Sequence, residues 1–139
     1  MTVDLNRRTV ERFDALLGSD DLSALDELCT ADMVNHALAP GRPAGLAGTR
    51  EFLTNHGARF GDTGWSSLTV VAEGDFVVQY GTRGGWWRGG DLLGFDAPSG
   101  HYSRDVAFMY RFVDGKIAER WAIRDDLTMM RQLGAITTA

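Results

Sequence analysis

Near its C-terminal end the chain reads Asp105-Val106-Ala107-Phe108-Met109-Tyr110-Arg111-Phe112-Val113-Asp114-Gly115-Lys116-Ile117-Ala118-Glu119-Arg120-Trp121. Apolar residues recur with a period of two on both sides of Asp114-Gly115, a dipeptide typical of tight hairpin turns. That period places successive side chains on opposite faces of a strand. The stretch therefore predicts two antiparallel strands, over residues 101–112 and 116–124. A closing helix is expected over 126–133.

The predicted strand 101–112 has two partly apolar faces. One face carries Tyr102, Arg104, Val106, Phe108, Tyr110 and Phe112. The other carries His101, Ser103, Asp105, Ala107, Met109 and Arg111. An exposed apolar sheet face is a liability in water, so we expect both faces to be covered. The Phe108 face should meet helices and a cavity, and the opposite face should pack against a second copy of the chain.

The residues upstream predict helices first and long strands afterwards. Helical patterns cover 4–18, 21–29 and 47–60, and a short extended segment is expected over 32–37. Strand patterns cover 65–73 and 76–88, with loops around residues 40–45 and 98–100. Glycines at positions 81, 84 and 85 favour a bend or bulge in the second of these strands. The order indicates a single α+β domain over residues 1–139, a cone-shaped curved antiparallel sheet packed by N-terminal helices around an apolar cavity.

Composition limits the classes of function. The chain has 139 residues, of which 44% are hydrophobic, and its formal net charge is -5. This acidic balance argues against non-specific binding to nucleic acid or to an anionic membrane surface. The polar N-terminus and the lack of an apolar run of about 20 residues lead us to expect a cytoplasmic protein that spans no membrane. Cys29 is the sole cysteine, so we expect a buried thiol and no internal disulfide.

Several site motifs are absent. His36, His56 and His101 are not paired at metal-ligand spacings, so we expect no metal site. The glycine-rich stretch 84–90 matches neither a dinucleotide fingerprint nor a phosphate loop, and no Gly-x-Ser-x-Gly elbow occurs. We therefore expect no organic cofactor either.

The C-terminal sequence nevertheless resembles that of one protein family. Asp114-Gly115-Lys116-Ile117, then Asp125 and the run Arg131-Gln132-Leu133-Gly134, are similar to segments of the SnoaL-like polyketide cyclase family. That family belongs to the nuclear transport factor 2-like superfamily of α+β cone folds. Weaker similarity extends upstream through Asn35-His36, residues 41–62 and 93–100, so the resemblance covers nearly the whole chain.

The resemblance implies a chemistry without metal or organic cofactor. Members close a ring of an aromatic polyketide by an intramolecular aldol step, in which a proton beside a carbonyl is removed and the enolate is stabilised in an apolar pocket. Relatives are assigned cofactor-free hydroxylation. The resemblance thus implies a cofactor-independent tailoring enzyme of natural-product biosynthesis, cyclase-type or hydroxylase-like, that binds a planar hydrophobic molecule.

The same segment departs from the family at three positions. Counting back from Arg131-Gln132-Leu133-Gly134 places Ala122 where the cyclases have an acid/base aspartate. Counting from Asp114-Gly115-Lys116 places Phe108 and Val106 where they have a histidine and a glutamine. The family's usual acid/base set is therefore missing, and a non-catalytic binding module or an epoxide-opening cyclase remains an alternative.

Four residues are candidates for catalysis in place of the missing set. Arg120 shares a strand face with Ala122 and would stabilise an oxyanion, unless it extends into water instead. His36 or His56 would move the proton, although both are also compatible with structural roles. Asn35 would donate to a carbonyl or support a turn.

Aromatic side chains are the candidates for binding a planar substrate, and about half of them are expected to line the pocket. The candidate substrate-binding residues are Trp65, Tyr80, Trp86, Trp87, Tyr102, Phe108, Ala122 and Val106. Asp125 is expected to cap the last helix, and a role as the catalytic acid is the alternative. Asp105 is expected to form an ion pair with Arg111 or Arg124 on the face away from the cavity.

Overall fold

The computed structural model describes residues 2–17, 19–41 and 44–137. Its helices are α1 (Thr2–Asp14), α2 (Leu25–Leu28), α3 (Leu46–Arg59) and α4 (Asp126–Leu133). Its strands are β1 (Cys29–Asn35), β2 (Phe60–Glu73), β3 (Phe76–Trp87), β4 (Gly90–Leu92), β5 (Phe95–Ala97), β6 (Gly100–Val113) and β7 (Lys116–Arg124). Helices come first and long strands follow, so the α+β class predicted from the sequence is confirmed.

One curved sheet organises the molecule, with strand order β1-β7-β6-β3-β2. The long strands β2, β3, β6 and β7 form the expected antiparallel meander, closed by tight turns at Gly74 and Asp114-Gly115. β1 differs, because it pairs with β7 in parallel. The segment expected as a short extended piece over 32–37 is therefore the parallel edge strand of the sheet.

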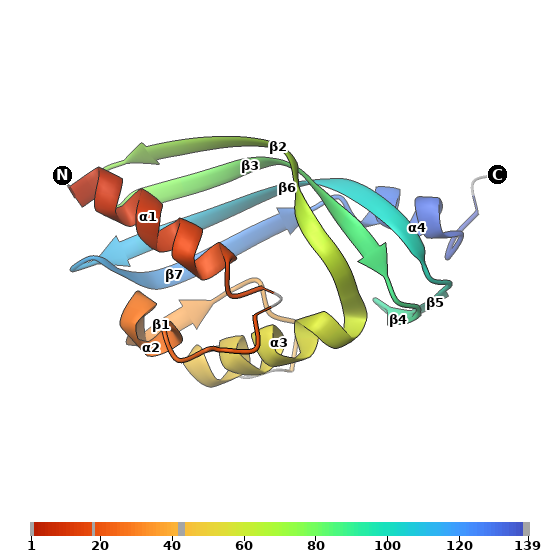
Figure 1. Ribbon diagram of the computed structural model, residues 1–139, viewed down its shortest axis with the longest axis horizontal. Coiled ribbons are helices and arrows are strands. Elements are labelled where there is room, and N and C mark those ends of the chain that lie inside the picture. The colour runs from red at the N-terminus through yellow and green to blue at the C-terminus, as the bar shows by residue number, and fades with distance from the viewer. Residues whose placement is uncertain (1, 18, 42–43, 138–139) are drawn as a thin grey trace.

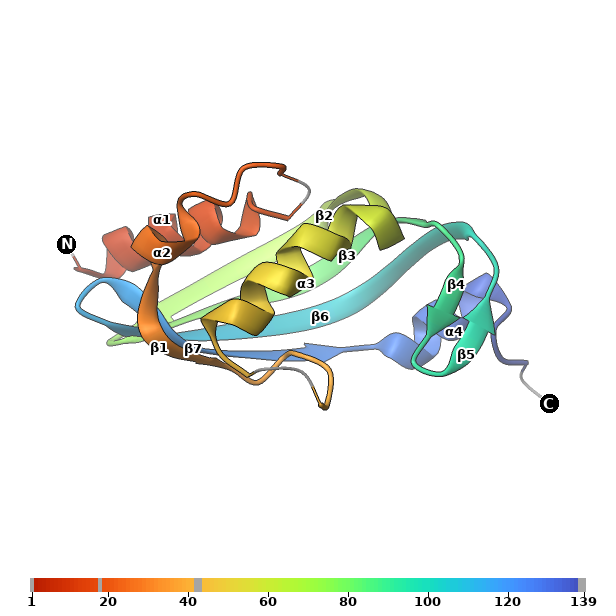
Figure 2. The same cartoon turned by 90° about the horizontal axis from the view of Figure 1, so that it is seen from below.

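The helices α1, α2 and α3 cover one face of this sheet, which is its concave face (Figures 1 and 2). Between them and the strands lies the main hydrophobic cluster, which includes Val10 and Phe13 of α1, Leu53 of α3, and Phe108 and Tyr110 of β6. Cys29 belongs to the same cluster and is buried, as expected, and burial raises the pKa of its thiol to about 12. The concave face is therefore the one on which side chains are withdrawn from water.

A second cluster closes the other end of the sheet. It contains Trp87, Tyr102 and Met129, and it packs α4 against β6 and the β4–β5 hairpin. This small hairpin replaces most of the loop expected before residue 101. Asp125 caps α4 by accepting a 3.1 Å hydrogen bond from the Thr128 backbone N–H, which confirms the capping role expected of it.

The curvature of the sheet has a visible cause. β2 bulges against β3 between Gly61 and Gly64 and again between Trp65 and Ser67. Opposite the second bulge, a Cβ atom on Gly81 would lie 2.1 Å from the backbone oxygen of Ser67. Only glycine permits so close an approach of two backbones. The bend expected from the glycines of residues 76–88 is thus confirmed, although the extra residues belong to β2.

Three predicted boundaries differ from the structure. α1 ends at Asp14, and Gly18, within the predicted helix 4–18, lies outside the described residues. The helix expected over 21–29 is only α2, because the Asp21 carboxylate accepts from the Ser23 backbone N–H and forms a local turn there. β2 starts at Phe60, five residues earlier than expected, because the chain passes from α3 into an extended conformation at that residue.

Candidate functional site

Four arginine side chains gather on the concave face of the sheet. Arg83 lies on β3, Arg104 on β6, and Arg120 and Arg124 on β7. Arg83 and Arg120 are buried, and the other two are half-buried. Two carboxylates pair with this group: Asp14 with Arg83 at 3.2 Å, and Asp126 with Arg104. The interior therefore holds more positive than negative charge, although the chain as a whole is acidic.

Arg120 is the most enclosed of the four, with 3% of its surface exposed. Its guanidinium carbon lies 4.7 Å from the ring centre of Phe108, 5.4 Å from that of Tyr110 and 5.5 Å from that of Phe13. Its Nε donates to the Tyr110 hydroxyl at 3.2 Å. Among the described residues, its terminal amino groups have no hydrogen-bond acceptor. The expectation that Arg120 faces the interior is confirmed; it does not extend into water.

Tyr110 fixes the position of this arginine. Its hydroxyl accepts from Arg120 and donates to Oε1 of the buried Gln79 at 3.5 Å. Complete burial raises the pKa of Tyr110, and the nearby Arg120 opposes part of that increase. The phenol is therefore neutral at physiological pH and serves as a hydrogen-bonding link between β3, β6 and β7.

A half-buried carboxylate lies close to this link. Asp14, the last residue of α1, accepts a 2.9 Å hydrogen bond from the indole N–H of Trp65 and pairs with Arg83. The Trp65 ring lies 4.9 Å from the Arg83 guanidinium carbon and meets Phe108 edge to face at 5.8 Å. Residues from α1, β2 and β3 thus place one carboxylate in the interior, where the sequence had suggested none.

Arg124 extends the positive charge along β7. Its guanidinium carbon lies 5.7 Å from the Phe108 ring centre, so it shares that ring with Arg120. Burial lowers the pKa of Arg124 to about 10, and the nearby charges of Arg120 and Arg104 contribute to the shift. Burial also lowers the pKa of Arg104. Like charges confined in a poorly solvated space produce this pattern.

His56 lies in the helical layer near three of these arginines, Arg83, Arg104 and Arg124. It is buried on α3, stacks on Phe60 at 4.8 Å and meets Phe52 edge to face. Burial lowers the pKa of His56 to about 4, and the arginines, Arg83 first among them, add to the decrease. The imidazole is therefore neutral at pH 7, and its ring forms no hydrogen bond with a described residue. Of the two histidines that the sequence offered as proton carriers, His56 is the one that lies in the interior.

Asn35 is buried, and both ends of its side-chain amide form hydrogen bonds within local structure. Its Nδ2 donates to the Thr49 hydroxyl at 3.1 Å, and its Oδ1 accepts from the backbone N–H of Ala37 at 3.0 Å. These bonds connect β1 to α3 and hold the turn that follows β1. The geometry matches the structural role of a turn asparagine rather than that of a donor to substrate.

His36 lies outside the cone. Its ring is stacked on Trp121 at 5.1 Å, and its Nε2 is 2.8 Å from Oε2 of Glu119. Glu119 and Trp121 alternate along β7 with the buried Arg120, so they point to the outer face. His36, offered by the sequence as a proton carrier, is therefore not in the interior, because the turn after β1 carries it to the outer side of the sheet.

The predicted substrate-binding residues separate into three groups. Trp65, Val106, Phe108 and Ala122 lie on the concave face near Arg120. Trp87 and Tyr102 are buried at the far end, where the Trp87 indole donates to the Ala97 carbonyl oxygen at 3.0 Å. Tyr80 and Trp86 point to the outer face, since they alternate with buried residues of β3. Tyr80 is exposed and Trp86 contacts His101, so placing these two in the pocket is wrong.

Asp105 also lies on the outer face, as its strand parity predicted. It accepts a 2.8 Å hydrogen bond from the Thr82 hydroxyl, whereas Arg111 pairs with Glu119. No described contact pairs Asp105 with Arg111 or Arg124, so the predicted ion pair is wrong. The adjacent strand offers a closer partner at residue 82.

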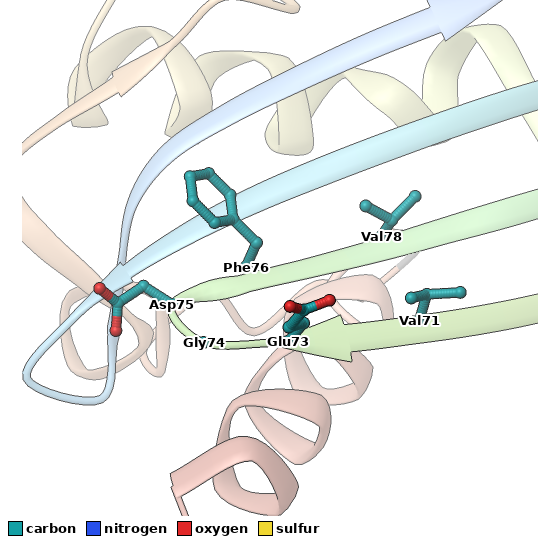
Figure 3. Close-up of a pocket in the computed structure, with 6 residues that line it drawn as sticks. All are labelled: Val71, Glu73, Gly74, Asp75, Phe76 and Val78. Carbon is teal, nitrogen blue, oxygen red and sulfur yellow. The ribbon is translucent and has the colours of Figure 1, made fainter.

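Two surface pockets have linings that include side chains of the outer face. The larger, of about 470 Å³, lies at the β2–β3 hairpin, where Figure 3 shows Val71, Phe76 and Val78 on the same side of the two strands. The smaller is lined by residues that include Tyr80, Ala107 and Ile123. The smaller pocket is also lined by Val106 and Arg124, so Arg124 borders a surface hollow, whereas Arg83, Arg104, Arg120 and His56 line neither pocket.

Sequence reasoning missed Asp14, Arg83, Arg124 and the Tyr110–Gln79 link. The position of Arg124 could have been inferred from the sequence, because residues 120, 122 and 124 lie on the same face of a strand. Asp14 was not, because its partners Trp65 and Arg83 are 51 and 69 residues away in the sequence. Among residues 2–17, 19–41 and 44–137, no helix is long and apolar enough to cross a membrane. The same residues contain no cluster of three or more His, Cys, Asp or Glu side chains arranged to hold a metal ion.

Comparison with known proteins connects this geometry to a family. A family model described as SnoaL-like polyketide cyclase matches residues 7–133. No curated protein matches the chain.

Solved structures share the whole fold. TsrD from Streptomyces laurentii is 26% identical with a TM-score of 0.79, over 96% of this chain and 97% of that one. IdmH from Streptomyces antibioticus, a candidate polyketide cyclase, is 27% identical with a TM-score of 0.74, over 93% and 98%. AclR from Streptomyces galilaeus, a candidate hydroxylase, is 20% identical with a TM-score of 0.76, over 99% and 85%, which shows likeness of fold alone.

Proposed function

We infer that this chain, which belongs to the SnoaL-like polyketide cyclase family, is a cofactor-independent tailoring enzyme that closes a ring in a planar, polyketide-like molecule. The observation that carries the proposal is Arg120, a buried guanidinium held by Tyr110, with terminal amino groups free of described acceptors. A fixed donor in an apolar interior is the arrangement that stabilises an oxyanion.

Arg120 is proposed to bind the substrate carbonyl. Its Nε is occupied by the Tyr110 hydroxyl, so the two terminal amino groups are the donors left for a ligand. Because Phe108, Tyr110 and Phe13 surround the guanidinium, water competes weakly for these donors. When a proton leaves the carbon beside that carbonyl, the enolate oxygen gains negative charge next to a cation whose position is already fixed.

His56 is proposed to accept that proton. Its imidazole is neutral at pH 7 because its pKa is lowered to about 4, and a neutral imidazole has a free lone pair. Burial and the arginine charges make it a weak base before substrate binds. The negative charge of the forming enolate offsets the arginines and raises the proton affinity of His56 during the reaction.

Ring closure then requires no further reactant. The enolate carbon forms the new carbon–carbon bond with a second carbonyl carbon of the same molecule. The alkoxide that results takes the proton back from the His56 imidazolium, so the product is an isomer of the substrate. Asp14, fixed by Trp65 and Arg83, is proposed to balance part of the positive charge rather than to transfer the proton.

A non-catalytic binding module is the second candidate. It is supported by Ala122, which occupies the place where the resemblance puts the family's aspartate, and by Asn35, whose side chain is engaged in local structure. Such a protein would hold the planar molecule between the aromatic residues and the arginines without removing a proton.

Exchange of carbon-bound hydrogen separates the two candidates. The purified protein is incubated in D2O with 1-tetralone, a neutral aryl ketone, and loss of the signal of the protons beside the carbonyl is followed by NMR. We expect the wild-type protein to accelerate exchange over buffer. Arg120→Met should reduce the acceleration about 100-fold, as loss of an oxyanion donor does, and His56→Gln should reduce it about 100-fold through loss of the base.

Arg131→Met is the matched control, because Arg131 is exposed on α4, away from the concave face. It should exchange at the wild-type rate. Exchange no faster than in buffer, together with measurable binding of the ketone, would support the binding module. Full activity in both Arg120→Met and His56→Gln would show that the roles are assigned to the wrong residues.

A further inference from the structure

We propose that Arg120 and Arg124, which flank Ala122 on the concave face of β7, form a binding site for the carboxylate of an aromatic ligand. The proposal rests on the proposed function and deepens it, because it assigns a charge to the substrate. It concerns the resting protein, before any enolate forms, and it is testable without turnover.

The first argument is the convergence of the two side chains. Residues four apart on a strand are about 13 Å apart along the backbone. The guanidinium carbons of Arg120 and Arg124 nevertheless lie 4.7 Å and 5.7 Å from the centre of one ring, that of Phe108. The residue between them on this face is Ala122, which pairs with Phe108 across the strands and has the smallest side chain that a chiral residue offers. The two guanidinium groups therefore share one aromatic neighbour, and the charge of Arg120 acts on Arg124, on either side of a position with little side chain of its own.

The second argument is the missing counter-charge. Arg83 and Arg104 are paired with Asp14 and Asp126, but no described carboxylate pairs with Arg120 or Arg124. The chain has 19 Asp and Glu residues against 14 Lys and Arg, so acids are not scarce. Burying two neighbouring guanidinium groups without an anion is costly, since burial and mutual repulsion both oppose their charges. A ligand anion would remove that cost.

The third argument is the match of shape. A guanidinium group presents two parallel N–H donors that fit the two oxygens of a carboxylate. Arg124 and Ala122 are half-buried, so this part of the concave face retains some contact with solvent. The lining by Phe108 and Trp65 suits an aromatic ring attached to the acid.

Two probes of similar size and shape, one charged and one neutral, test the proposal. Binding of 2-naphthoate and of 2-naphthamide to the full chain is measured by calorimetry at pH 7.5 and low salt. We expect the naphthoate to bind at least about tenfold more tightly, as a charge-assisted hydrogen bond implies. In Arg124→Met the two affinities should come within about twofold of each other, and Arg120→Met should show the same loss.

Arg131→Met, on the exposed face of α4, should keep the wild-type preference. If Arg120→Met does not fold, Arg124→Met decides, because it leaves the bond between Arg120 and Tyr110 intact. Equal affinity for the two probes, no measurable binding of naphthoate, or a preference that survives Arg124→Met would overturn the proposal. A preference for naphthoate without exchange of 1-tetralone would leave this site standing and remove the proposed enzyme activity.

Discussion

At the scale of single residues, the two histidines that the sequence treated alike have opposite surroundings. His56 is buried near Arg83, Arg104 and Arg124 of the concave face, whereas His36 meets Glu119 on the outside. Sequence alone offered each of them as a proton carrier. Only the position of the turn after β1 and the orientation of α3 separated the buried candidate from the surface one.

The surroundings of His56 predict an acid-sensitive fold. Its pKa is about 4 in the folded chain and about 6.5 when unfolded, so the unfolded state binds the extra proton between these values. The stability that neutral His56 provides is therefore complete above pH 6.5 and is lost as the pH falls toward 4. We expect a loss of about 2 kcal/mol over this range, after some allowance for screening.

Urea unfolding of the wild type and of His56→Gln, at pH 7 and pH 5, measures this effect. The wild type should lose more stability than the variant between the two pH values, because carboxylates that titrate in this range affect both proteins alike. Parallel losses in the two proteins would show that His56 is not the group responsible.

At the scale of the elements, the hairpin β6–β7 and the glycines of β3 determine where side chains point. The parity predicted for residues 101–112 holds along the whole of β6, which placed Phe108 on the concave face and Asp105 on the outer face. The alternation of side chains does not predict that Tyr80 and Trp86 point outward, because an aromatic residue fits the outer face of a strand as well as the inner one.

The close approach of β2 and β3 at the bulge predicts that one added methyl group destabilises the folded protein. Gly81→Ala would place its Cβ 2.1 Å from the Ser67 backbone oxygen, so β2 must move. We expect a loss of about 2 kcal/mol in the free energy of unfolding, as is usual for forced backbone shifts. Thermal or urea unfolding measures it.

Gly57→Ala is the control for this change, because a Cβ on Gly57 has no neighbour within 4 Å and the residue lies in α3. It should stabilise the protein by about 0.5–1 kcal/mol through helix propensity. Equal changes in the free energy of unfolding for the two substitutions would show that the bulged pair β2–β3 tolerates a side chain at residue 81.

At the scale of the whole molecule, the helices protect one face of the sheet and leave the other uncovered (Figure 2). The uncovered face carries exposed apolar side chains on several strands, among them Val71, Tyr80 and Ile123, the last 76% exposed. The larger surface pocket lies on this face as well, and Tyr80, Ala107 and Ile123 of this face help to line the smaller one. Because this face carries both protruding apolar side chains and a pocket, it can pack against the same face of a second copy across a two-fold axis. We propose a homodimer formed through this face.

Light scattering at micromolar concentration tests the dimer. The wild type should have a mass of roughly 30 kDa, twice the 15.2 kDa of one chain. Ile123→Lys should shift the population to monomer, because a charge would be buried at the centre of the contact. Leu5→Lys, at an exposed position of α1 on the other side of the molecule, should leave the mass unchanged. A monomeric wild type would contradict the proposal.

The sequence by itself determined the meander of strands, its hairpin turns, its glycine bend and the inward face that carries Phe108 and Arg120. These features depend on neighbours a few residues apart, whose spacing a strand fixes by its geometry. The tertiary structure alone decided that Asp14 meets Trp65 and Arg83, that β1 joins β7 in parallel, and that His36 lies outside. Those outcomes depend on how helices and loops pack onto the sheet, because each requires groups far apart in the chain to come within a few ångströms, which no local pattern records.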